Sequence, residues 1–544
     1  MAIAKSNTND LASLFKEGFF KIPPYQRRYS WDIKQQLDLL NDLVEAYQTN
    51  TKHFLGTLSV QLIETKGFDS IYNLIDGQQR FTTLIILYSC LADISGNITY
   101  KNYLKRNNEY FLEPRSPDEK KFLSSLLDSQ VAKPETLSQH LMLQAKTEFN
   151  KRIKNFGKTK ADDFINFILN NAIFLIYPVD DYTASIKMFE TINDRGMPLG
   201  YFDKIKSFFL YYSDKFANRR LDNIIELTFD HIYQFFDKQN LALKVNNDAT
   251  LLLYHYLSNP VLFSGWSYTK STENIYLDFK KEVINYSQSN VSNGENYISS
   301  YLKDLSCFID SCLEIEEKIK NNHLFREFYL LLEPNQRMFP LSIRFNQKGI
   351  LNLTLSMLEK IEFYLKFRRD PKKDIFKLLK EVIEYKGTND DLIIHINNTF
   401  YYIFKWQDNA IDIVNSATWA AKYALYQLNK KKYNQEFSVS NYKAIEVEHI
   451  FPQEPSFPIS KYGYDEESYR HLLNNIGNLT LLEKELNGSS GASNKPPEDK
   501  INQDYLNSDV ILTRNISVKD INDVKQRSSD IELFLDEYFV FDLK

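Results

Sequence analysis

The chain has 544 residues, of which 43% are apolar and 14% aromatic, and its formal net charge is −5. This composition excludes a largely disordered protein, and the length predicts roughly two to four domains. The slight acidic excess argues against a protein coated in basic surface for indiscriminate DNA binding. No stretch approaches the ~18 uninterrupted apolar residues of a membrane span, and the N-terminus lacks the apolar core of a signal peptide, so we expect a cytoplasmic protein without a membrane partner.

Strands and helices alternate in the first part of the chain. Residues 53–63 and 71–76 predict two strands joined by a turn near Gly67, residues 81–94 a helix, and residues 171–180 a later strand. From 215 to 419, apolar residues recur at spacings of three and four, which predicts a mainly helical segment. After residue 420 a helix, two short strands and a polar helix start are expected. We therefore predict an α+β, multidomain fold divided into residues 1–214, 215–419 and 420–544.

The stretch KIPPYQRRYSWD, residues 21–32, interleaves aromatic rings with an amide and guanidinium groups. Such a pattern is typical of surfaces that stack on bases and contact phosphates. The candidate DNA-sensing residues are Tyr25, Gln26, Arg27, Arg28 and Trp31. The alternative is that these aromatic residues belong to the core.

A second polar cluster lies in NLIDGQQRFTTLIIL, where Asp76 and Gly77 are sufficient for a turn. The following residues, Gln78, Gln79 and Arg80, are more than a turn requires. Asp76 could bind a metal ion or water, the two amides could position water, and Arg80 could hold phosphate at the first turn of a helix. The alternative is a structural brace between Asp76 and Arg80.

Two other segments bear on phosphate binding. The segment FETINDRGMPL would add Asn193 and Arg195 near the Asp76–Arg80 cluster. The sequence around Gly157 ends like a Walker phosphate loop, but Arg152 stands where that motif needs its first glycine. Hydrolysis of a nucleoside triphosphate (NTP) would therefore have to use the Asp76–Arg80 cluster.

A third cluster places Glu448 and His449 side by side in EVEHIFPQ, followed downstream by Asn478 and Asn487 in IGNLTLLEKELN. Histidine has a pKa near neutrality, which suits a base that activates water. Glutamate and asparagine oxygens suit Mg²⁺ or Mn²⁺ better than a soft metal. The alternative is a β-hairpin whose polar residues serve only turns and hydrogen bonds.

The order EHIFP, GNLTLL and a final Asn resembles the ββα-metal, or HNH, nuclease motif. The resemblance implies that His449 is the general base, that Glu448 and Asn487 bind the metal ion, and that Asn478 braces the loop and orients His449. Two departures put the strength of metal binding in question. The acid is Glu where Asp is commoner, and the last position is Asn where His is commoner.

The motifs IPPYQRRYSW, HFLGTL, LIDGQQRFTTL and FETINDRGMPL resemble, in this order, the DUF262 domain. That ParB-like domain is the N-terminal half of GmrSD-like, modification-dependent (type IV) restriction endonucleases, and the C-terminal segment resembles its usual companion, the DUF1524 HNH module. The resemblance implies hydrolysis of an NTP, GTP or ATP, at residues 76–80, and cleavage of modified foreign DNA in antiviral defence.

Two other functions remain open from the sequence. One is a non-catalytic DNA-binding or regulatory protein with a degenerate HNH domain, which the Asn at position 487 favours. The other is an NTPase switch that acts on a protein partner. The sequence leaves open which nucleotide is hydrolysed, which DNA modification is recognised, whether DNA is nicked or cut through both strands, and whether the protein is a homodimer.

Overall fold

The computed structural model describes residues 8–67, 69–114, 116–130, 133–181, 183–186, 188, 199–237, 243, 245, 247–263, 265–332, 338–367, 372–404, 410–416, 418–487 and 494–539. The chain forms two compact units. Unit 1 comprises residues 1–240, 246–252 and 271–309, and unit 2 comprises residues 241–245, 253–270 and 310–544. The expected division into three segments stays a prediction. Within the described ranges, no helix is long and apolar enough to cross a membrane.

Unit 1 is built on a six-stranded mixed sheet of order β1-β8-β3-β4-β2-β7. Its strands are β1 (Thr8–Asp10), β2 (Gly18–Ile22), β3 (His53–Lys66), β4 (Asp69–Asp76), β7 (Leu112–Pro114) and β8 (Ala172–Pro178). A separate short hairpin joins β5 (Lys105–Arg106) and β6 (Glu109–Tyr110). The strands β3, β4 and β8 confirm the three that the apolar runs predicted.

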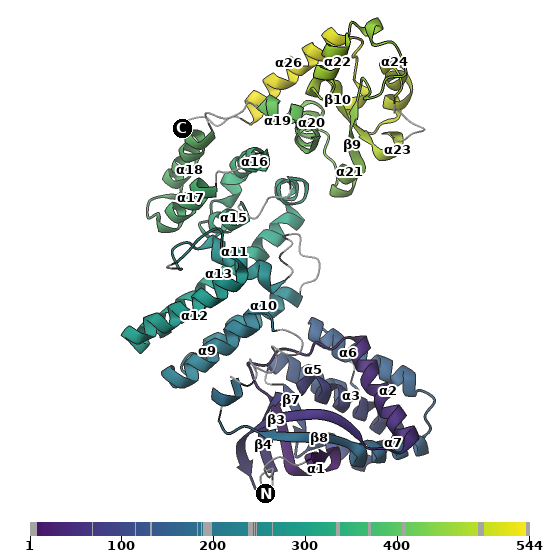
Figure 1. Ribbon diagram of the computed structural model, residues 1–544, viewed down its shortest axis with the longest axis vertical. Helices are drawn as coiled ribbons and strands as arrows, with labels where there is room; N and C mark the ends of the chain where they lie inside the picture. The colour runs from purple at the N-terminus through teal and green to yellow at the C-terminus, as the bar shows by residue number, and fades with distance from the viewer. Residues whose placement is uncertain are drawn as a thin grey trace. The chain divides into compact units, whose positions relative to one another are not determined.

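Helices cover this sheet and extend from it (Figure 1). They are α1 (Leu11–Glu17), α2 (Ile33–Thr49), α3 (Gln78–Ser95), α4 (Ile98–Leu104), α5 (Pro117–Leu127), α6 (Leu137–Ile153), α7 (Lys158–Asn171), α9 (Tyr201–Ala217), α10 (Asp222–Asp237) and α12 (Thr272–Ser289). Helices α11 (Asp248–Ser258) and α13 (Val291–Asn321) contribute residues to both units. The predicted helix at 81–94 is α3, which begins three residues earlier.

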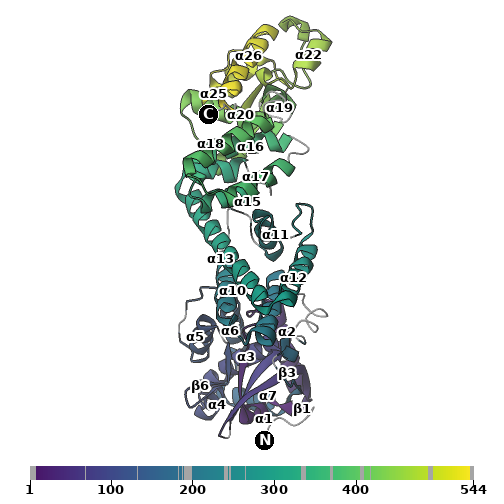
Figure 2. The same cartoon turned by 90° about the vertical axis from the view of Figure 1, so that its left-hand side faces the viewer.

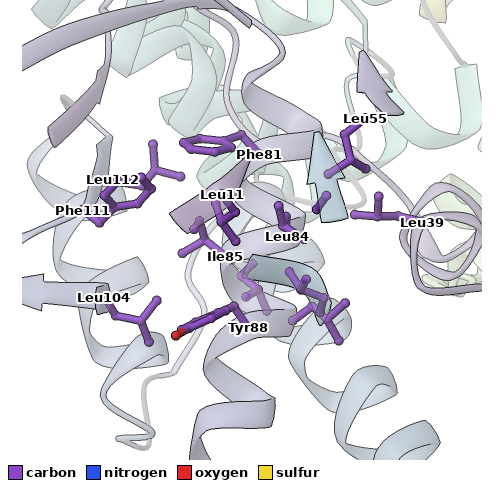
Figure 3. Packing of buried hydrophobic residues seen from close by; sticks show 14 of the residues in the cluster. Leu11, Leu39, Leu55, Phe81, Leu84, Ile85, Tyr88, Leu104, Phe111 and Leu112 are labelled. Carbon is purple, nitrogen blue, oxygen red and sulfur yellow. The ribbon is translucent and has the colours of Figure 1, made fainter. Parts of the chain in front are cut away.

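Helix α3 is the centre of the first core. Nearly all of its residues are buried, so it is apolar on all sides rather than amphipathic. Phe81, Leu84, Ile85 and Tyr88 pack among residues from other elements of the unit, among them Leu11, Leu39, Leu55, Leu104, Phe111 and Leu112 (Figure 3). The start of this helix is therefore rigidly attached to the core.

Gly77 makes the abrupt change from β4 to α3. Its φ is +88°, in the left-handed region, and it precedes the helix without any side-chain cap. A Cβ atom at this position would lie 2.9 Å from the carbonyl oxygen of Thr57 and would also collide with Leu58. The predicted role of Gly77 in the turn is confirmed. Glycine is required here for a second reason, because β3 lies too close to leave room for a side chain.

Unit 2 is mostly helical. Its elements are α14 (His323–Arg326), η1 (Glu327–Leu332), α15 (Met338–Gln347), α16 (Leu351–Phe367), α17 (Lys372–Glu384), α18 (Asn389–Phe404), α19 (Ala410–Ser416), α20 (Thr418–Tyr433), α21 (Val439–Ala444), β9 (Ile445–His449), η2 (Ile459–Tyr462), α22 (Glu466–Leu472), η3 (Ile476–Asn478), β10 (Leu479–Glu483), α23 (Lys484–Asn487), α24 (Pro497–Asp499), η4 (Lys500–Asp504), η5 (Tyr505–Asn507), α25 (Ile511–Arg514) and α26 (Ile521–Tyr538). Helices α16, α17 and α18 lie together in both views (Figures 1 and 2). The elements described between 215 and 419 are helices, as predicted, and the fold is α+β.

Candidate functional site

The strands β9 and β10 form an antiparallel hairpin that carries the Glu448–His449 pair. Glu448 lies opposite Thr480, and His449 lies opposite Leu479. Adjacent side chains on a strand point to opposite faces, so the two residues have different surroundings. Glu448 is buried, whereas His449, at the end of β9, is partly exposed to solvent.

Asn478 lies in the turn η3, one residue before β10. Its side chain is 1% exposed and makes three hydrogen bonds. Oδ1 accepts from the Phe451 amide at 2.8 Å, and Nδ2 donates to the carbonyls of Phe451 at 3.0 Å and Leu473 at 2.9 Å. The Ile450 amide also donates to the Asn478 carbonyl at 2.8 Å. Asn478 therefore holds the backbone that directly follows His449.

Among the described residues, the imidazole of His449 has one hydrogen-bond partner. Its Nε2 lies 3.0 Å from Oδ1 of Asn474, which is an exposed residue in the turn after α22. A carbonyl oxygen only accepts, so this bond requires the proton on Nε2. In that tautomer Nδ1 is the nitrogen that can accept a proton from water.

The carboxylate of Glu448 faces a lysine that the sequence reasoning missed. Nζ of Lys500 lies 2.6 Å from Oε1 of Glu448 and donates to the carbonyl of His449, also at 2.6 Å. Burial lowers the pKa of the Lys500 ammonium, and the negative charge of Glu448 acts against this shift. The hydroxyl of Tyr505 lies 3.5 Å from the same Oε1.

The predicted metal ligands partly fit a divalent ion. Among the described residues, no hydrogen bond reaches Oε2 of Glu448, so one of its oxygens remains available. Asn487 is the last residue of α23 and is partly buried. No group of three or more His, Cys, Asp or Glu side chains that could hold a metal occurs in the described ranges. A pair of protein oxygens completed by water is a normal arrangement for Mg²⁺, and these two residues match it in chemistry.

A second cation, the partly buried Arg527 on α26, supports the turn that contains Asn478. One of its nitrogens donates to the carbonyls of Ile476, Gly477 and Leu479 at 2.7 to 3.0 Å. Burial lowers the pKa of Arg527 to about 10. A Cβ atom at Gly477 would collide with the carbonyl of Val524, so only glycine lets α26 approach this closely. Nothing in the local sequence around residue 527 indicates this role.

In unit 1 the structure brings the two predicted N-terminal clusters together. Nε2 of Gln78 donates to the carbonyl of Arg27 at 2.9 Å, and Nε2 of Gln79 donates to that of Arg28 at 3.1 Å. Oε1 of Gln79 accepts from the amide of Ser30 at 2.8 Å. The two amides that were expected to position water instead hold the backbone of residues 27–30.

A cavity lies beside this contact and includes about 720 Å³ of empty space, part of it open to solvent. Among its lining residues are Gln26, Arg27, Arg28, Gln78, Gln79, Lys206, Glu226, Asp230 and Tyr233. Tyr25 is fully buried and Gln26 donates to the carbonyl of Ile75. Their side chains are therefore not on an open stacking surface, and the predicted DNA-sensing segment faces a cavity instead.

Arg80 lines a different, open groove together with Trp31, His53 and Phe54. Its guanidinium donates to the carbonyl of Leu55, and a Cβ atom at Gly56 would collide with it. Asp76 lies at the end of β4. Its negative charge acts against the lowering of the pKa that burial imposes on Arg80 and on Arg27. Asp76 thus lies within electrostatic reach of both sites, while Asn193 and Arg195 fall outside the described residues.

Arg28 is surrounded by acidic side chains that no motif predicted. Its guanidinium lies 3.3 to 4.0 Å from carboxylate oxygens of Asp118 and Glu119 near the start of α5, and of Asp230 and Asp237 on α10. The guanidinium is also 5.5 Å from the centre of the Tyr233 ring. We call these four carboxylates the acidic ring. They outnumber the charge of Arg28, and Lys206 also acts on Asp230.

We expect Arg28→Met to destabilise unit 1 by about 2 to 3 kcal/mol at pH 8 and by less at pH 5. Burial raises the pKa of Glu119, Asp230 and Asp237, and the charge of Arg28 lowers it. A carboxyl whose pKa is higher in the folded than in the unfolded state favours folding most strongly at a pH below its unfolded pKa of about 4. This contribution to stability is lost as the pH rises through the folded pKa. Removing Arg28 raises the pKa values of these carboxyls further, so the variant loses more stability than the wild type as the pH rises from 5 to 8.

Thermal melting of the wild type, Arg28→Met and Arg152→Met at the two pH values measures this effect. Arg152 is an exposed arginine on α6 and serves as the matched control. A destabilisation by Arg28→Met of the same size at pH 5 and pH 8 would contradict the role given to the acidic ring.

Two protein-family models match the chain, one in its N-terminal part and one in its C-terminal part. Residues 9–210 match the N-terminal domain of GmrSD restriction endonuclease, and residues 402–531 match the C-terminal domain of GmrSD restriction endonucleases. The first range contains the groove and most of the residues that line the cavity, and the second contains the hairpin with Lys500 and Arg527. The comparison with curated proteins gave no match.

Proposed function

Because the chain belongs to the GmrSD-like type IV restriction endonucleases, we propose that it hydrolyses an NTP with its N-terminal segment and cuts modified foreign DNA at His449. A role as a restriction endonuclease, with DNA as the substrate, follows from the family. The HNH mechanism, the divalent metal ion, the NTP and the dependence on DNA modification are our proposals. So are the ParB-like fold of the N-terminal domain and a location in the cytoplasm.

The hydrogen bonds of Asn478 are the observation that carries the nuclease proposal. They fix the two residues after His449, and they do so from the turn that directly precedes β10. This is the bracing role that the HNH resemblance gives to the central asparagine. A hairpin that served only as structure would have no need of a partly exposed histidine beside such a brace.

His449 would act as the general base in DNA cleavage. With Nε2 bound to Asn474, its Nδ1 accepts a proton from the water that attacks the phosphodiester. Glu448, through its available oxygen, and Asn487 would hold Mg²⁺ or Mn²⁺. A divalent ion bound there supplies positive charge to the phosphate oxygens and to the leaving group.

For NTP hydrolysis we propose the region between the cavity and the groove. Asp76 acts electrostatically on Arg27, which lines the cavity, and on Arg80, which lines the groove. Two guanidinium groups within electrostatic reach of one carboxylate suit a triphosphate with its metal ion. The cavity between Arg27, Arg28 and Tyr233 would admit the base or the modified nucleotide of DNA.

Cleavage assays test this function directly. Purified protein is incubated with Mg²⁺ or Mn²⁺, with and without GTP or ATP, on phage DNA that carries or lacks base modifications. We expect cutting of at least one modified DNA that is stimulated by NTP, and little cutting of the unmodified DNA. Absence of cutting on every substrate would favour a DNA-binding protein with a degenerate nuclease site. The Asn at position 487, where His is commoner, is the feature that favours this second function.

Arg80→Ala is expected to slow NTP hydrolysis by about 100-fold, because a positioned donor to a phosphate contributes about that much to the rate. Phosphate release measures this effect, and Arg152→Ala, an exposed arginine in the same unit, is the matched control. Thermal melting shows whether loss of the contact with Leu55 has unfolded the protein. Full activity of a folded Arg80→Ala variant would remove this residue from the NTPase site.

A further inference from the structure

We infer that Lys500 is a positioning residue of the nuclease site, where one ammonium group fixes the Glu448 carboxylate and the His449 backbone together. The inference rests on the proposed function. Neither the HNH motif nor the family match assigns a role to this lysine. Its place in the sequence, about 50 residues after His449 and beyond Asn487, is outside the hairpin itself.

The contacts of Lys500 are short and almost completely shielded from water. Nζ lies 2.6 Å from Oε1 of Glu448 and 2.6 Å from the carbonyl oxygen of His449. The side chains of Lys500 and Glu448 are 1% and 7% exposed. A buried ammonium and carboxylate without each other would be costly, so the pair forms as one unit.

The local backbone explains why the lysine reaches this point. The short helix α24 is followed at once by the π-helical turn η4, whose first residue is Lys500. The Lys500 amide donates to the carbonyl of Pro496 at 3.2 Å, and four residues later Asp504 pairs with Lys495 at 2.8 Å. The segment is therefore fastened on both sides of Lys500, and its ammonium points to the end of β9.

The two contacts join consecutive residues whose side chains point to opposite faces of the strand. The ammonium holds Glu448 by its side chain and His449 by its main chain, so it fixes the general base relative to the carboxylate proposed to hold the metal ion. It leaves Oε2 of Glu448 available. At the same time its positive charge repels a second cation near that carboxylate and weakens metal binding.

Removing the charge of Lys500 should therefore slow DNA cleavage but strengthen metal binding. In Lys500→Met we expect kcat for DNA cleavage to fall by about 10- to 100-fold, as for other residues that orient metal ligands. In the absence of DNA, we expect Mn²⁺ to bind Lys500→Met about tenfold more tightly than it binds the wild type, because the repelling charge is gone. Calorimetry with Mn²⁺ measures the second effect without cleavage. A purely structural role would weaken both properties.

Lys495→Met is the matched control, since Lys495 is a nearby lysine that pairs with Asp504 rather than with Glu448. If Lys500→Met does not fold, Lys500→Met with Glu448→Gln removes both buried charges and is compared with Glu448→Gln alone. We expect the double variant to cut about tenfold more slowly than Glu448→Gln, because the His449 carbonyl has lost its donor. Equal rates would overturn the inference.

Cleavage by the wild type tests the proposed function, whereas the cleavage and Mn²⁺ affinity of Lys500→Met test the role of this lysine. If wild-type protein cuts no DNA, the nuclease proposal fails, and calorimetry alone then decides on Lys500. Equal or weaker Mn²⁺ affinity of a folded Lys500→Met variant overturns the inference in either case. If wild type cuts DNA and Lys500→Met cuts equally well, the nuclease proposal stands and Lys500 has no positioning role.

Discussion

Replacing His449 with alanine is expected to reduce DNA cleavage by about 10²- to 10⁴-fold, which is the usual contribution of general acid–base catalysis. NTP hydrolysis should continue at the wild-type rate, because the residues proposed for it lie in unit 1 and His449 lies in unit 2. The imidazole is partly exposed and, within the part of the chain that the structure describes, makes one hydrogen bond, to Asn474, so its loss should change the stability of the fold little. Nicking of a plasmid or phage DNA, measured beside phosphate release, checks both expectations.

His471→Ala is the matched control for this variant. His471 lies on α22 in the same unit and is exposed, so it shares the residue type and the surroundings but not the hairpin. We expect wild-type cleavage from it. Equal cleavage by wild type and His449→Ala would exclude His449 as the base and would end the HNH assignment, whatever the NTPase activity.

The parts of the fold that the sequence predicted well are those in which local pattern and tertiary role agree. Apolar runs predicted β3, β4, β8 and the central helix, and Gly77 marked the turn between two of them. The order of Glu448, His449 and Asn478 predicted a hairpin because all three lie on or beside its two strands. In each case the residues that meet in space are also near each other in the chain or follow a known motif.

The residues that sequence reasoning missed come from distant segments. Lys500 reaches Glu448 from a turn about 50 residues away, and Arg527 reaches the Asn478 turn from another helix. Asp230 and Asp237 reach Arg28 from α10, about 200 residues downstream. Isolated charged residues on helices most often face water, so nothing in their local sequence distinguishes these from their neighbours.

The division of residues 78–80 between two sites has a similar origin. The sequence grouped Gln78, Gln79 and Arg80 because they are adjacent. In the first turn of a helix, however, successive side chains point about 100° apart. Gln78 and Gln79 therefore line the cavity and hold the 27–30 backbone, while Arg80 lines the groove beside Trp31. Only the direction of α3, which its core packing fixes, decides which residue faces which site.

Asn478→Ala is expected to lower the free energy of unfolding of unit 2 by about 4 to 6 kcal/mol. The side chain is buried and makes three hydrogen bonds to backbone groups, and each buried group left without a partner costs about 1 to 3 kcal/mol. Because the lost bonds hold Phe451, close to His449, cleavage should also fall in protein that is still folded. Denaturant unfolding and cleavage below the melting temperature measure the two effects.

Two neighbouring substitutions separate the bracing role from general damage to the turn. Asn475→Ala removes one bond, from the Gly477 amide to a partly buried side chain, and should cost only about 1 kcal/mol with little loss of cleavage. Asn478→Asp keeps the acceptor for the Phe451 amide but places a buried carboxylate against the carbonyls of Phe451 and Leu473, so at neutral pH it should be at least as destabilising as Asn478→Ala. If Asn478→Ala proved no more damaging than Asn475→Ala, the backbone after His449 would be held by the strand pairing and the Ile450 amide alone. The brace that carries the nuclease proposal would then be unnecessary.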